Sequence, residues 1–81
     1  MHLDVRLFAR ARDLAGSETV AVELADGATV SDLKTALATQ YPVLDPIVAH
    51  LHVAIGTDYA NDKTVLDASN QVTCFPPVSG G

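Results

Sequence analysis

The chain begins with alternating apolar and polar positions, which predict two strands. The apolar members of the first strand are Leu3, Val5 and Leu7, with charged residues between them. The same period of two returns over residues 19–24. Between the two strands, residues 9–15 predict a short helical turn that ends at Gly16, because glycine tolerates the left-handed conformation of a helix C-cap.

After Asp26 and Gly27 the apolar pattern changes to the period of a helix. Thr29 has the side chain of an N-cap, and Asp32 follows three residues later to satisfy and charge the first turn. Apolar residues then recur on one helical face at Val30, Leu33, Ala36 and Leu37. The pattern predicts one main helix over residues 30–40, which stops before Pro42.

The second half of the chain reads as strands and turns. A third strand is predicted over residues 51–55, and short pieces at residues 59–60 and 64–66 flank a turn at residues 61–62. In a last strand over residues 71–75, Val72 and Cys74 face inward. This order predicts an α+β fold, a mixed sheet with one main helix across one face. We expect one domain over residues 1–75 and an extended tail over residues 76–81.

Composition adds limits on location and partners. The chain has 81 residues, of which 48% are hydrophobic, enough for one small core and not for two. A single cysteine excludes an intrachain disulfide and favours a reducing compartment. No apolar run has the length of a signal peptide or a membrane span, so we expect a cytoplasmic protein. The net charge of −5 argues against nucleic acid and anionic membranes as partners.

The last seven residues, Phe-Pro-Pro-Val-Ser-Gly-Gly, carry the main candidate chemistry. Gly81 would present an unhindered carboxylate, and Gly80 lets the backbone lie flat in a narrow channel. Pro76 and Pro77 favour an extended segment that projects from the domain. We therefore predict that the Gly81 carboxylate is the reactive group, and the alternative is a terminus without function.

Two phenylalanines are candidates for partner binding. Strand alternation places Phe75 on the face opposite Val72 and Cys74, and Phe8 follows the first strand on the face of its charged residues. If the first and last strands pair, the two rings form one apolar patch with an arginine rim, a pattern typical of protein interfaces. In the alternative, Phe8 packs into a secondary core. Arg12 is either part of this interface or an ordinary solvated charge.

Other reactive side chains give weaker signals. Cys74 lies within an inward strand pattern, where a thiol usually serves as a small core residue. His50 and His52 share one strand face but have no third ligand at a suitable spacing, so we expect no metal site. The sequence shows no nucleophile–base pair and no glycine-rich phosphate loop. We therefore expect no catalysis by the chain alone.

The tail, together with residues 8–16, resembles the family of molybdopterin synthase small subunits. Members of this family are ubiquitin-like sulfur carriers. The resemblance covers the whole chain, although residues 67–70 and Gly56 depart from the usual pattern. It implies a ubiquitin-like β-grasp fold. It also implies that an E1-like adenylyltransferase, using ATP and Mg²⁺, adenylates Gly81 and that a C-terminal thiocarboxylate follows.

The resemblance further implies the partners. The tail, including Val78 and Ser79, would insert into the large subunit of a heterotetrameric molybdopterin synthase. Sulfur would then pass to a cyclic pyranopterin precursor, with catalysis on the large subunit and no cofactor bound by the carrier. Arg12 would help to grip the activating enzyme. The alternatives are a sulfur carrier for thiamin or cysteine biosynthesis, a ubiquitin-like modifier of lysines, and a β-grasp binding module with an inert tail.

Overall fold

The computed structural model describes residues 1–77, which form a mixed five-stranded sheet in the order β2-β1-β5-β3-β4. The strands are β1 (His2–Leu7), β2 (Thr19–Glu23), β3 (His52–Ile55), β4 (Asp58–Ala60) and β5 (Val72–Phe75). The central strands β1 and β5 run parallel, and every other neighbouring pair is antiparallel. The prediction of a mixed sheet is confirmed.

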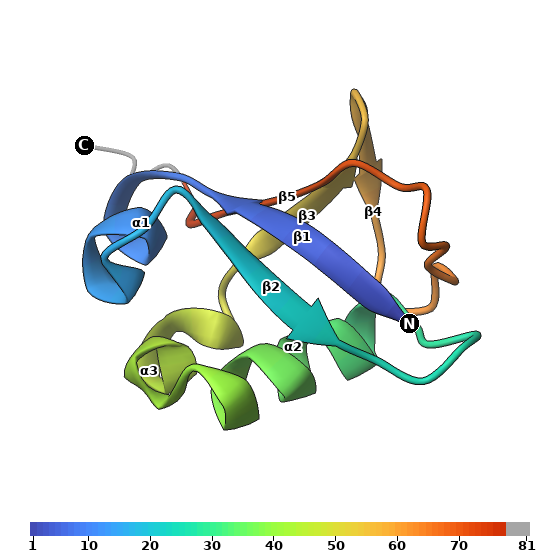
Figure 1. Ribbon diagram of the computed structural model, residues 1–81. Helices are drawn as coiled ribbons and strands as arrows, with labels where there is room; N and C mark the ends of the chain where they lie inside the picture. The colour runs from blue at the N-terminus through green and yellow to red at the C-terminus, as the bar shows by residue number, and fades with distance from the viewer. Residues whose placement is uncertain (78–81) are drawn as a thin grey trace.

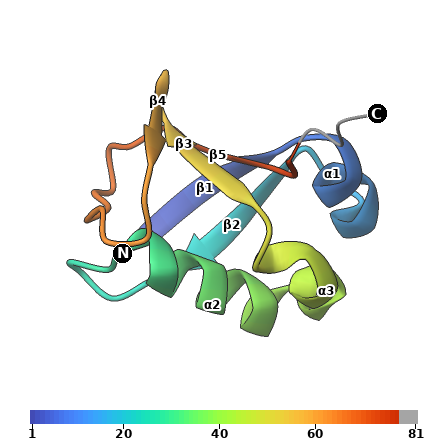
Figure 2. The same cartoon turned by 180° about the vertical axis from the view of Figure 1, so that it is seen from behind.

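One main helix, α2 (Val30–Gln40), crosses one face of this sheet, and the other face is left open (Figures 1 and 2). The short helix α1 (Ala9–Ala15) lies at the end of the sheet where β5 finishes, whereas the N-terminus lies at the opposite end. A 3₁₀ turn η1 (Pro42–Leu44) and the short helix α3 (Asp45–Val48) continue from α2. This is the α+β, β-grasp arrangement that the sequence predicted.

The core lies between the covered face of the sheet and α2. The inward residues of β1 are at most 1% exposed, and so are the apolar residues of α2 that face them: Leu3, Val5, Leu7, Val30, Leu33 and Leu37. Each such side chain contributes about 1.5–3 kcal/mol when it is fully removed from water. The predicted apolar faces of the first strand and of the main helix are therefore confirmed.

The predicted ends of both helices are also confirmed. The Asp32 N–H donates to Thr29 Oγ1 at 3.3 Å, and the Thr29 N–H donates to Asp32 Oδ2 at 2.9 Å, which completes a capping box. At the end of α1, Gly16 has a φ of 73° and donates its N–H to the Arg12 carbonyl at 2.9 Å. Local hydrogen bonds therefore set the start of α2 and the end of α1.

Two segments differ from the sequence-based expectation. Pro42 ends α2 as predicted, but it also begins η1, because a proline needs no N–H partner in the first turn of a helix. η1 and α3 were not predicted. Residues 64–66 form no strand: Val65 makes only an isolated bridge with Thr29, so this segment borders the start of α2 and does not extend the sheet. Within residues 1–77, no helix is long and apolar enough to cross a membrane.

Candidate functional site

Three aromatic side chains, here called the aromatic cluster, gather on the open face of the sheet: His52, Tyr59 and Phe75. The sheet register brings them together, because His52 is the direct partner of Phe75, and Tyr59 lies on the next strand, opposite Ala54. The Phe75 ring centre is 5.6 Å from that of His52 and 5.7 Å from that of Tyr59. These distances and tilted geometries are those that aromatic pairs prefer.

The aromatic cluster is accessible to a partner. Tyr59 is 81% exposed, His52 is exposed, and Phe75 is half-buried. The neighbouring β5 residues Val72 and Cys74 point into the core, so alternation directs Phe75 to the open face as the sequence predicted. Exposed aromatic side chains that gather on one face are a common feature of protein interfaces. Phe75 is also the last residue of β5, so the cluster lies where the tail begins.

Phe8 has different neighbours from Phe75. Its ring is 40% exposed, and the Arg6 guanidinium lies 5.1 Å from the ring centre, within the range of a cation–π contact. The ring contacts of Phe75 are made instead with the β3 and β4 aromatics. The backbone of Phe8 is still extended, and its N–H donates to the Cys74 carbonyl at 3.2 Å, so Phe8 lies beside the end of β5. One joint Phe8–Phe75 patch stays a prediction.

Arg12 lies on the adjoining helix α1. Its side chain is 46% exposed, and its Nε lies 3.7 Å from a carboxylate oxygen of the neighbouring Asp13. An exposed pair of this kind contributes little to stability. Arg12 is thus accessible at the end of the molecule where β5 finishes (Figure 1), and its role in partner binding stays a prediction.

Cys74 is fully buried, as the inward strand pattern predicted. Burial raises the pKa of its thiol to about 12, because the apolar surroundings disfavour the charged thiolate. A thiol with this pKa is almost entirely protonated at neutral pH, and the thiolate is the reactive form. Cys74 is therefore a core residue and is poorly suited to carry or donate sulfur.

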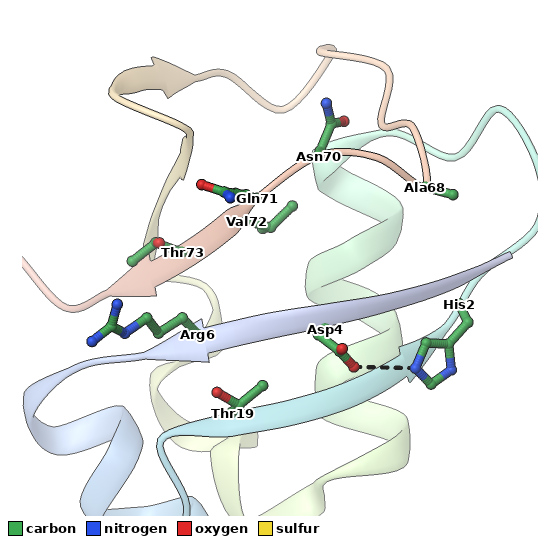
Figure 3. Close-up of a pocket in the computed structure, with 9 residues that line it drawn as sticks. All are labelled: His2, Asp4, Arg6, Thr19, Ala68, Asn70, Gln71, Val72 and Thr73. Atoms are coloured by element: carbon green, nitrogen blue, oxygen red, sulfur yellow. Dashed lines mark hydrogen bonds and ion pairs between the residues drawn. The ribbon is translucent and has the colours of Figure 1, made fainter.

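The rest of the open face is polar and contains an open hollow of about 610 Å³ (Figure 3). Arg6 and Thr73 lie toward one end of it, and His2 and Asp4 lie toward the other. His2 contacts Glu23 at 3.0 Å and Asp4 at 3.1 Å, and these two carboxylates raise the pKa of its imidazole. Among residues 1–77, no group of three or more metal-ligating side chains converges. The hollow therefore offers polar contacts to a partner.

The predicted tail residues are only partly within the described chain. Pro76 is half-buried and Pro77 is exposed. The remaining four predicted tail residues, Val78, Ser79, Gly80 and Gly81, lie outside the described residues. The reactive carboxylate at Gly81 therefore stays a prediction from the sequence.

Sequence reasoning missed two members of the aromatic cluster. His52 was considered only as a metal ligand, and Tyr59 only as part of a short strand. The available signal was alternation, since His52 precedes the buried Val53 and must point to the opposite face. The pairing of β3 with β5, which brings His52 beside Phe75, is a long-range contact that no local pattern specifies.

Comparison with known proteins gives consistent relationships over the whole chain. The ThiS family matches residues 5–81. The chain is 34% identical over 83 residues to the molybdopterin synthase sulfur carrier subunit of Chlamydomonas reinhardtii, with 100% of both chains covered. It is 33% identical over 87 residues to small archaeal modifier protein 1 of Haloferax volcanii, covering 98% of this chain and 100% of the relative.

The fold is shared as well. A crystal structure of the Haloferax volcanii small archaeal modifier protein 1 superposes with a TM-score of 0.85 at 32% identity, covering 95% of this chain and 98% of that one. The predicted ubiquitin-like β-grasp fold is thereby confirmed. Since the family match spans nearly the whole chain and full-length relatives exceed 30% identity, the chain belongs to the ThiS family.

Proposed function

We propose that this protein is a sulfur carrier, the small subunit of molybdopterin synthase, and that it acts in molybdenum cofactor biosynthesis. One observation carries the proposal: the chain matches a molybdopterin synthase sulfur carrier subunit from end to end, at 34% identity. The family match also reaches residue 81, so it includes the diglycine. Sulfur would be held as a thiocarboxylate on Gly81 and passed to a cyclic pyranopterin precursor.

The proposed chemistry requires activation of a carboxylate. At neutral pH the Gly81 carboxylate is a poor electrophile, because its negative charge repels nucleophiles. Attack of this carboxylate on the α-phosphate of ATP releases pyrophosphate and forms an acyl adenylate. A sulfur nucleophile then attacks the acyl carbon, and AMP leaves with the electrons of the broken C–O bond. An E1-like adenylyltransferase would supply the ATP, the Mg²⁺ and the charge stabilisation, and the carrier would supply only the carboxylate.

The described residues fit a carrier in which the tail, and not the thiol, bears the sulfur. The buried Cys74, with its pKa raised to about 12, is unsuited to compete with the tail as the sulfur-bearing group. The aromatic cluster lies at the base of the tail and would anchor the partner while the tail enters it. The partners would be the large subunit, in a heterotetramer that carries out the catalysis, and the adenylyltransferase, both in the cytoplasm.

A second function is favoured by a specific observation. A full-length relative at 33% identity is named a small archaeal modifier protein, so a ubiquitin-like modifier is the main alternative. Both functions would use the same activated Gly81 acyl group. They differ in the nucleophile, which is sulfur for a carrier and the amine of a target lysine for a modifier. Sulfur carriers for thiamin or cysteine biosynthesis would share the activation step and differ in the recipient.

A reconstituted sulfur-transfer assay tests the proposal. It combines the carrier with the large subunit and the adenylyltransferase of the same organism, ATP, Mg²⁺, a sulfide source and the cyclic precursor, and it measures molybdopterin. Removal of Gly81, or addition of one residue after it, should abolish transfer, because the reactive carbon must lie at one fixed distance from the domain. Circular dichroism confirms that each variant is folded. Full transfer by the extended variant would refute the terminal-carboxylate mechanism.

A further inference from the structure

In the described part of the chain, the strand β2 forms one edge of the sheet and has β1 as its only neighbour in the sheet order. Two hydrogen bonds show which residues of β1 and β2 are bonded to each other. The Leu24 N–H donates to the Met1 carbonyl at 2.8 Å, and the Leu7 N–H donates to the Glu18 carbonyl at 2.7 Å. Antiparallel pairs alternate between hydrogen-bonded and non-hydrogen-bonded positions. The non-hydrogen-bonded positions of β2 are Thr19, Ala21 and Glu23. Their N–H and C=O groups therefore point outward, away from β1.

Outward backbone groups of this kind normally offer a template for another strand. In this chain, side chains from outside β2 already bond five of these six groups. The Gln40 amide both accepts from the Glu23 N–H at 3.1 Å and donates to the Glu23 carbonyl at 2.9 Å. The Tyr41 hydroxyl donates to the Ala21 carbonyl at 2.6 Å. The Ser17 hydroxyl donates to the Thr19 carbonyl at 2.8 Å. All three outward carbonyls of β2 therefore accept a hydrogen bond from a side chain.

The Gln40 side chain imitates a neighbouring strand. Its carboxamide presents an acceptor and a donor to one residue, which is the same pair of bonds that a residue of an antiparallel strand exchanges with its partner. Gln40 is the last residue of α2, and Tyr41 is its C-cap, with its N–H bonded to the Leu37 carbonyl at 2.8 Å. Since Leu37 is fully buried, the helix end that carries both side chains is fixed against the core.

We infer that Gln40 and Tyr41 are specificity-determining residues that close the β2 edge to strand addition, above all by β2 of a second copy of this chain. β2 has the sequence Thr-Val-Ala-Val-Glu, which is rich in strand-forming residues and has one charge. With its edge open, two copies would pair antiparallel about a two-fold axis and join their sheets. Closure of this edge would leave the open face of the sheet for partner binding. This inference does not depend on the proposed sulfur chemistry.

The test is the solution mass of the double variant Gln40→Ala/Tyr41→Phe, measured by light scattering after size exclusion over a range of concentrations. The wild-type chain should stay near its monomer mass of 8.5 kDa, and the double variant should approach twice that mass as concentration rises. Thr39→Ala is the matched control and should remain monomeric, because among residues 1–77 the Thr39 hydroxyl bonds only the Thr35 carbonyl within α2. A folded double variant that stays as monomeric as the wild type would overturn the inference, as would a wild-type dimer joined through β2.

If the double variant does not fold, the single variant Gln40→Ala gives an independent measurement. Amide hydrogen exchange at Glu23 should be faster than in the wild type by about tenfold in dilute solution, since one neutral hydrogen bond of about 1–1.5 kcal/mol is lost. Exchange should slow again as concentration rises, when β2 of a second copy covers the edge. Exchange that does not depend on concentration would contradict the role of Gln40 in closing the edge.

Discussion

Truncation of Phe75 to alanine separates the packing of this ring on the sheet from its proposed role in partner binding. The ring is half-buried and lies 5.6 and 5.7 Å from the rings of His52 and Tyr59. A fully buried phenylalanine loses about 3–5 kcal/mol on truncation, and each aromatic pair contributes about 0.5–1.5 kcal/mol beyond area burial. For a half-buried ring we expect the free energy of unfolding to fall by about 1–3 kcal/mol.

Binding of Phe75→Ala to the large subunit should weaken independently of this loss of stability. If Phe75 anchors the large subunit, Phe75→Ala should cost about 1–3 kcal/mol of binding free energy. This is about a 5- to 150-fold increase in Kd. Isothermal titration calorimetry with the large subunit gives the affinity, and urea denaturation of the free carrier gives the stability. Both measurements are made at a temperature at which the variant is folded, so that unfolding does not lower the apparent affinity.

Two further variants make this result interpretable. Tyr59 is 81% exposed, so Tyr59→Ala should weaken binding while changing stability little. Val65 is 62% exposed and lies outside the aromatic cluster, so Val65→Ala should leave the affinity unchanged. A large loss of stability in Phe75→Ala with unchanged affinity would show that the ring serves only the fold. Unchanged affinity in Tyr59→Ala would refute the aromatic cluster as the anchor.

Three other predictions follow from the core, the open face and the capping box. Cys74→Ser should lose about 1–3 kcal/mol of stability, because a buried hydroxyl needs a hydrogen-bond partner. Mass spectrometry should still detect sulfur on the folded variant. Failure of the folded variant to acquire any sulfur would favour chemistry at the thiol. The pKa of His2 is raised by Glu23 and Asp4, so its stabilising contribution should be present below pH of about 6.5 and lost as pH rises through the folded-state pKa. An NMR titration midpoint for His2 at or below 6.5 would contradict this contact. Thr29→Ala should cost about 1 kcal/mol, or about 4–8 °C in Tm, and an unchanged Tm would show that the capping box is not stabilising.

Local signals in the sequence predicted most of the secondary structure. The main helix was predicted within its observed bounds, because Thr29 and Asp32 specify its start and Pro42 forbids its continuation. The short helix ends at Gly16 for the equally local reason that its C-cap has a positive φ. In both segments, a few neighbouring residues contain all the information that the chain needs.

Features that depend on strand register could not be predicted in this way. His52 meets Phe75 only because β3 pairs with β5, and Gln40 reaches Glu23 only because the end of α2 lies beside the β2 edge. Phe8 keeps an extended backbone, and the chain turns into α1 at Ala9, which has a φ of 53°. The site therefore depends on long-range pairing that the apolar pattern does not specify.

The central claim is that sulfur resides on the Gly81 carboxylate. The most direct test is the mass of the intact protein purified from its native host, with fragmentation to locate any change. We predict a fraction whose mass has increased by the exchange of one oxygen atom for one sulfur atom, confined to the C-terminal residue and absent when Gly81 is removed. A host population without this exchange, in which the chain is found instead in conjugates with other proteins or carries sulfur at Cys74, would contradict the claim.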